Sequence, residues 1–63
     1  MEDFQLLTPK EVAKILKVAA PTVYAWANRG VIPFFKLEGV VRFKLEDVKA
    51  FVEARRVEKA FKY

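Results

Sequence analysis

Residues 20–44, APTVYAWANRGVIPFFKLEGVVRFK, decide the fold of this chain. Apolar residues at helical spacing predict a helix over 20–29. Gly30 follows at the point where a helix C-terminus favours a residue with positive φ. Pro33 then prevents any helical continuation. The next apolar and basic residues alternate across a turn, so we predict a β-hairpin over 34–43.

The register of this hairpin can be argued from side-chain alternation. A two-residue loop would set Phe35 opposite Arg42, which puts an apolar and a basic side chain on one face. A three-residue loop over 38–40 separates the two kinds of residue, and alternation therefore favours it. That register pairs Lys36 with Arg42, and both project outward side by side. The predicted inward face holds four apolar residues: Phe35, Leu37, Val41 and Phe43.

A further helix is predicted over 8–17, after an apolar lead-in. Thr8, Pro9 and Glu11 combine an N-cap, a proline at the first helical position and the partner residue of a capping box. One face of this helix should pack against one face of the helix over 20–29. The residues of the first face are Val12, Ile15 and Leu16, and those of the second are Val23, Trp26 and Ala27.

The last predicted helix runs over 45–61. Glu46 and Asp47 lie in its first turn, where acidic side chains complement the helix dipole. The core-facing residues are expected to be Val48, Phe51 and Val52. A second apolar stripe consists of Ala50, Ala54, Val57 and Phe61. This stripe either wraps the segment around Phe4 or forms the seam of a homodimer, and the sequence leaves both alternatives open.

Length and composition indicate one small domain over residues 1–63. A domain of this size buries only about 60% of the surface that its unfolded chain exposes. Six phenylalanines, one tryptophan and two tyrosines, with 54% hydrophobic residues, supply a rich core. No apolar run approaches a membrane span, and no signal-peptide pattern opens the chain. We expect a soluble, cytoplasmic protein.

The residue types weigh against catalysis. The chain has no cysteine and no histidine, which excludes disulfides, thiolate nucleophiles, imidazole bases and the usual zinc ligands. Glu46 and Asp47 are adjacent, so on a helix they point about 100° apart and cannot flank one substrate atom. We expect a protein that is not an enzyme and binds no metal, cofactor or small-molecule substrate. The net charge of +4 and a pI near 9.6 favour a polyanionic partner.

Several groups of residues together have the spacing of a known family. They are Leu7-Thr8-Pro9-Lys10-Glu11-Val12-Ala13, Thr22-Val23-Tyr24 with Trp26, Arg29-Gly30 with Ile32-Pro33, and Arg42-Phe43 with Glu46-Asp47-Val48 and Phe51. Over residues 6–55 the chain resembles the excisionase-like branch of the MerR-type winged helix-turn-helix family. The resemblance implies a mainly α fold of three helices and a two-stranded wing. It also implies that the helix over 20–29 enters the major groove of double-stranded DNA, with the wing on the adjacent backbone or minor groove.

Carried over residue by residue, the resemblance implies a DNA surface on the second helix and the wing. Thr22 either contacts a phosphate or only satisfies the helix start. Tyr24 takes a groove-facing position, and Asn28 precedes the end of the helix. Arg29 either reaches a phosphate or caps the last carbonyls. The full expected set is Lys10, Thr22, Tyr24, Asn28, Arg29, Lys36, Arg42 and Lys44.

The chain departs from its relatives at positions that weaken DNA binding. Ala20 and Ala25 stand where basic or polar side chains are usual, and Ala19 replaces a serine cap. Glu38 and Val40 stand at the wing tip, where glycine and a basic residue are typical. Our leading hypothesis is a non-enzymatic DNA-binding protein of the excisionase or transcription-regulator type, with weak or poorly selective binding. The alternative is a protein-interaction module or scaffold of the same fold whose DNA surface has been lost or altered.

Overall fold

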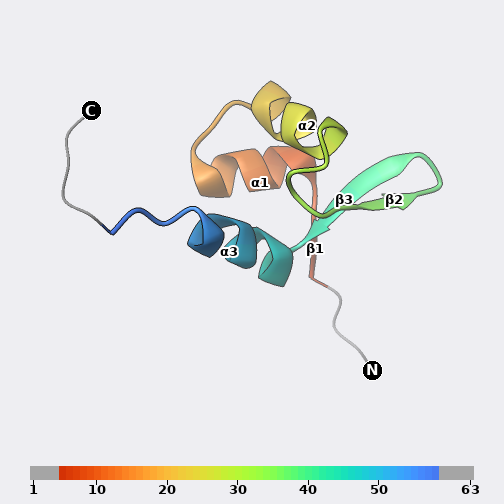
Figure 1. Cartoon of the computed structure of the whole chain (residues 1–63). Coiled ribbons are helices and arrows are strands. Elements are labelled where there is room, and N and C mark those ends of the chain that lie inside the picture. Colours follow the sequence, from red (N-terminus) through yellow and green to blue (C-terminus); the bar gives the residue numbers. More distant parts are fainter. Residues whose placement is uncertain (1–4, 59–63) are drawn as a thin grey trace.

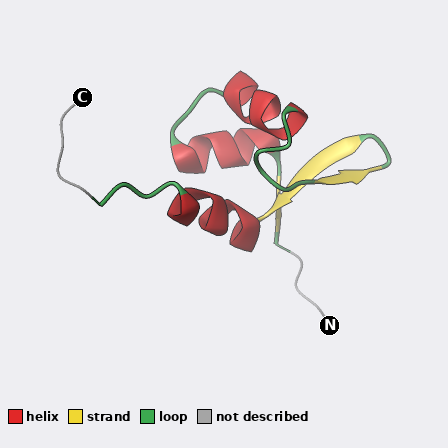
Figure 2. Ribbon diagram, viewed as in Figure 1, coloured by secondary structure: helices red, strands yellow, loops and turns green. Residues whose placement is uncertain are grey.

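The computed structural model describes residues 5–58, and within them three helices and three strands. They are β1 (Leu6–Leu7), α1 (Pro9–Leu16), α2 (Ala20–Asn28), β2 (Phe35–Leu37), β3 (Val40–Lys44) and α3 (Leu45–Ala54). The strands form an antiparallel sheet in the order β1-β3-β2, and the β2–β3 hairpin projects beyond the helices (Figure 1). Colouring by secondary structure separates the three helices from this small sheet (Figure 2). The predicted fold class, a winged helix-turn-helix, is confirmed.

Local capping sets the start of α1 as predicted. The Thr8 hydroxyl accepts from the Glu11 amide at 3.0 Å, and the Thr8 amide donates to the Glu11 carboxylate at 2.8 Å. The helix ends at Leu16, because Lys17 adopts a left-handed conformation with φ 58°. The short turn that follows leads directly into α2.

The end of α2 also follows the prediction. Gly30 has φ 71°. The Gly30 amide donates to the carbonyl of Ala27 and the Val31 amide to that of Trp26, both at 3.0 Å. This pair of bonds is a Schellman motif, which satisfies two carbonyls at the helix end. At the other end, Ala19 makes no side-chain cap, as its methyl group dictates.

The core lies between the helices and the inner side of β3. Its buried residues are Val12, Ala13, Val23, Ala27, Ile32, Phe43, Val48 and Phe51. Trp26 is half-buried and packs against Phe51, with ring centroids 5.1 Å apart and ring planes tilted by 45°. Two helical residues predicted in the core are instead exposed, Ile15 at 50% and Val52 at 44%. Both line an open groove between α1 and α3, where solvent reaches them.

The predicted hairpin register is wrong. The strands pair as Phe35 with Arg42 and Leu37 with Val40, which leaves a two-residue loop. Glu38 has φ 52° and Gly39 has φ 86°. Positive φ at both central residues is what a type I′ turn requires, and such turns match the twist of the flanking strands.

Alternation failed here because it assumed that both strands cover the core. Phe43 of β3 is buried and Val41 is half-buried, but all three residues of β2 are exposed. Burial of one face fixes the register of a strand only when that face packs on the core, and neither face of β2 does so. The turn therefore decides the register.

The observed register divides the wing residues between two faces. Lys36 pairs with Val41, so it lies on the face that looks toward the helices, with Phe43. The residues of the pairs Phe35–Arg42, Leu37–Val40 and Leu6–Lys44 lie on the opposite face. We call it the outer sheet face, and it comprises Leu6, Phe35, Leu37, Val40, Arg42 and Lys44. Lys36 and Arg42 therefore lie on opposite faces and not side by side.

The last helix is shorter than predicted, since α3 ends at Ala54. The Arg55 guanidinium donates to the carbonyl of Phe51 at 3.1 Å and lies 3.9 Å from the centroid of its ring. Beyond Phe51 the helix has passed the core, and helices gain most of their stability from packing. The predicted stripe is thus broken, because Val57 follows the helix. Phe4 and Phe61, on which its two interpretations depend, lie outside the described residues.

Candidate nucleic-acid interface

The exposed face of α2 is the first part of the expected DNA surface. Val23 and Ala27 are buried, so the opposite side of the helix faces solvent. With 3.6 residues per turn, that side is centred on Pro21, Ala25 and Asn28. Asn28 is the polar member of this centre, and it is exposed. The middle of the helix surface therefore offers one side-chain amide beside two apolar residues.

Tyr24 and Thr22 lie at opposite borders of this surface, about 160° apart around the helix. Tyr24 is 48% exposed and lies at the border next to Asn28. Thr22 is half-buried, and its amide donates to the carbonyl of Ala19 at 3.0 Å. Ala20, expected on the reading surface, is also half-buried and packs against the core. The structure thus brings Tyr24 and Asn28 together and leaves Thr22 apart from them.

Two cations belong to the same side of the molecule as α2. Arg29 is the exposed C-cap residue of the helix. Lys36 is exposed on β2, on the sheet face that looks toward the helices. Figure 1 shows that only a short loop separates the end of α2 from this hairpin. Of the expected basic residues, Arg29 and Lys36 are therefore the two on the α2 side of the molecule.

The remaining three expected cations lie elsewhere. Lys10 is exposed on α1, in the first turn of that helix. Arg42 and Lys44 belong to the outer sheet face, opposite to Lys36. Arg42 is half-buried, and its guanidinium donates to the carbonyl of Val41 at 2.7 Å. The eight expected residues thus do not form a single surface.

The cations on the α2 side form no ion pair within residues 5–58, as is true of every basic residue there except Arg56. Within residues 5–58 the ion pairs are made by Arg56, which lies 3.6 Å from the carboxylates of Glu53 and Glu58. Neither Arg29 nor Lys36 pairs with a carboxylate in this part of the chain. Their charges therefore remain available to a ligand. No group of three or more metal-ligating side chains occurs in residues 5–58.

The sequence reasoning missed one surface feature, a shallow groove on the outer sheet face. It has a volume of about 330 Å³ and is lined by Leu6, Phe35, Leu37 and Lys44. The signal that could have found it is the dipeptide Glu38-Gly39. A glycine at the second position of a two-residue hairpin loop is typical of the turn that places Phe35 and Leu37 outside.

The helix-turn-helix domain family matches residues 6–56, which is most of the chain. The chain therefore belongs to this excisionase-like family of helix-turn-helix DNA-binding domains. A search of curated proteins found no match. None of the helices in residues 5–58 has the length and apolar character needed to cross a membrane.

Proposed function

We propose that the chain is a small, cytoplasmic, non-enzymatic DNA-binding protein of the excisionase or transcription-regulator type. The observation that carries this proposal is the exposed face of α2 with Tyr24 and Asn28, flanked by Arg29 and by Lys36 of the wing. On this fold, α2 enters the major groove. The wing then lies along the adjacent backbone or minor groove.

Each of these side chains has a distinct role in the proposed complex. The Asn28 amide can donate to and accept from the edge of an adenine, which is the usual bidentate contact of asparagine in the major groove. Tyr24 contacts a phosphate or a base through its hydroxyl. Arg29 and Lys36 neutralise phosphates and supply most of the affinity.

Selectivity should be low, because the centre of the reading surface is apolar. Pro21 and Ala25 have no group that donates to or accepts from a base edge. A single bidentate contact contributes about 1–3 kcal/mol of discrimination between bases. Specific regulators prefer their site over random DNA by about 4–10 kcal/mol. We therefore expect binding that depends strongly on salt and weakly on sequence.

A salt titration tests this proposal. Fluorescence anisotropy of a random-sequence duplex should report binding at about 50 mM salt and an affinity about tenfold lower at about 200 mM, as two phosphate contacts imply. Arg29→Ala and Lys36→Ala should each weaken binding. Each should also flatten the slope of log affinity against log salt by about 0.9, because one phosphate contact is lost.

Lys49→Ala is the matched control, since Lys49 is an exposed lysine on α3. It removes the same charge away from the proposed surface and should leave the slope nearly unchanged. Equal effects of all three substitutions would show that only net charge matters. The absence of binding at micromolar protein and about 50 mM salt would refute the proposed function.

A further inference from the structure

The outer sheet face is apolar at its centre although the fold does not require it to be. Phe35 is 40% exposed, Leu37 45% and Val40 44%. All three project away from the core, so polar side chains would serve the hairpin equally well. Contiguous exposed apolar groups of this kind usually mark an interaction site.

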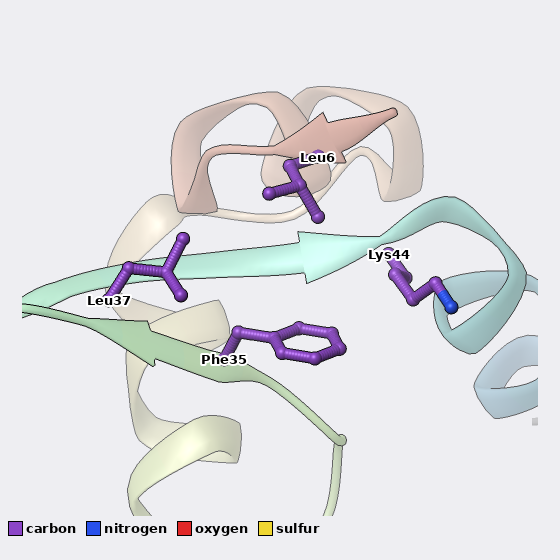
Figure 3. Close-up of a pocket in the computed structure, with 4 residues that line it drawn as sticks. All are labelled: Leu6, Phe35, Leu37 and Lys44. Atoms are coloured by element: carbon purple, nitrogen blue, oxygen red, sulfur yellow. The ribbon is translucent and has the colours of Figure 1, made fainter. Parts of the chain in front are cut away.

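This face is hollowed. The groove of about 330 Å³ takes its walls from all three strands. Figure 3 shows the side chains of Leu6, Phe35 and Leu37 around a common space, with the Lys44 amine at one end. The hollow has room for a bulky apolar side chain, which would contact Leu6 on one side and Phe35 on the other.

The two charged residues of the outer sheet face are both basic. Lys44 lines it, and Arg42 lies on the same face as the cross-strand partner of Phe35. Neither residue forms an ion pair within residues 5–58. A second copy of the chain docked on this face would bring cations against cations, which weakens association. The charge pattern therefore calls for an acidic partner.

Nucleic acid fits this face less well than an acidic protein. Single strands bind on successive aromatic platforms, but the groove has one ring among aliphatic side chains. The phosphate backbone of a duplex has no apolar group to fill a hollow between Leu6 and Phe35. The apolar groups of a protein would gain about 25 cal/mol for each Å² of surface buried there.

We propose that the groove on the outer sheet face docks an acidic segment of another protein, with a bulky apolar side chain in the hollow and carboxylates at Lys44 and Arg42. The site lies on the opposite face of the sheet from Lys36. A partner can therefore dock here while α2 and Lys36 contact DNA. The proposal does not depend on the proposed DNA binding, because it uses different residues.

The test is an NMR titration of the whole chain with nine-residue peptides in which glutamate alternates with leucine, phenylalanine or tryptophan. At least one of these peptides should bind with a dissociation constant below about 1 mM and shift amide signals of β1, β2 and β3. Peptides with lysine in place of glutamate, or with alanine in place of the apolar residue, should bind at least tenfold more weakly.

Two pairs of variants locate the site. Leu37→Thr introduces a β-branched residue, which suits a strand, but removes the apolar wall, and should weaken binding of the acidic peptide about tenfold. Its control, Val52→Thr, changes an exposed apolar residue on α3 and should have no effect. Lys44→Glu should weaken the acidic peptide and strengthen the lysine peptide, whereas the control Lys49→Glu should change both by less than twofold. Amide spectra verify that each variant is folded.

Other results would overturn the proposal. An equal loss of binding with Val52→Thr would move the site to the groove between α1 and α3, which Val52 lines. Concentration-dependent shifts of the outer sheet face without peptide would identify a second copy as the occupant. Tighter binding of oligothymidine at Leu6 and Phe35 would identify single-stranded nucleic acid. The lack of binding by every acidic peptide would exclude the docking site.

Discussion

Lys17 holds a backbone conformation that lysine rarely adopts. Its φ of 58° ends α1, and the Val18 amide donates to the carbonyl of Ala13 across it at 2.9 Å. A left-handed residue with a Cβ atom carries a penalty of about 1–2 kcal/mol, which glycine escapes. The turn between α1 and α2 therefore stores strain at one residue.

Lys17→Gly should stabilise the protein. The relief of strain is partly offset by the greater freedom of glycine in the unfolded chain, which leaves a gain of up to about 1 kcal/mol. For a domain of this size that gain raises the thermal midpoint by up to about 4–8 °C, measurable by circular dichroism. Lys14→Gly, in the last turn of the same helix, should lower the midpoint, because glycine disfavours a helix interior by about 1 kcal/mol. A lower midpoint for Lys17→Gly would contradict the strain argument.

At the scale of single residues, the caps were the most predictable features. The bonds between Thr8 and Glu11 and the positive φ of Gly30 depend on residues that are close in sequence. Lys17 was not anticipated because its conformation is imposed by the packing of α1 against α2. No residue type near it signals a left-handed turn.

At the scale of the elements, the two-residue turn of the wing fixes the pairing register of the hairpin. Glu38 and Gly39 both have positive φ, and this turn sets every pairing in the hairpin. Asparagine tolerates such a conformation better than glutamate does, and Asn-Gly is the preferred type I′ pair. Glutamate at this position is therefore an unfavourable choice for the hairpin.

Glu38→Asn should stabilise the wing by about 0.5 kcal/mol, a fraction of the left-handed penalty. Backbone amides of β2 and β3 should exchange with solvent more slowly, as hydrogen-exchange NMR can measure. Glu38→Gln is the control, since it removes the same charge without favouring the turn. If both variants slow exchange equally, charge and not turn geometry governs the hairpin.

The presence and type of the helices and strands were predicted better than the end of α3 and the register of the hairpin. The two helices over residues 8–29 and the location of the hairpin follow from local signals. The register did not, because the exposure of β2 depends on how far the hairpin extends beyond the helices. The same reason explains why Lys36 and Arg42, expected together in the site, lie on opposite faces. Alternation in sequence cannot tell which face a strand presents when neither is buried.

At the scale of the whole molecule, Phe43 connects the sheet to the helices. It is the largest of the fully buried side chains, and it lies on the strand that pairs with both neighbours. Its ring contacts that of Phe34, with centroids 6.4 Å apart. In a domain of 63 residues few other groups can compensate for its loss.

Phe43→Ala should remove about 3–5 kcal/mol from the free energy of unfolding. Domains of this length have about 3–9 kcal/mol in total, and each kcal/mol lost lowers the thermal midpoint by about 4–8 °C, so the midpoint should fall by more than about 10 °C. Trp26 fluorescence reports this directly, because the indole packs on Phe51. Val40→Ala, on the exposed outer sheet face, should leave the melting curve nearly unchanged. A Phe43→Ala midpoint within a few degrees of the parent would show that the core is not centred on β3.

The short strand β1 has a consequence for the order of folding. Its pairing joins Leu6 to Lys44, across the whole helix-turn-helix and hairpin, whereas α1 and α2 meet through neighbouring segments. Closing a long loop costs more entropy than closing a short one, so β1 should dock last and detach first. Leu6 leaves with it, and one wall of the outer groove opens while the helices stay packed. Local detachment of β1 can therefore open and close the groove on the outer sheet face while the surface of α2 stays unchanged.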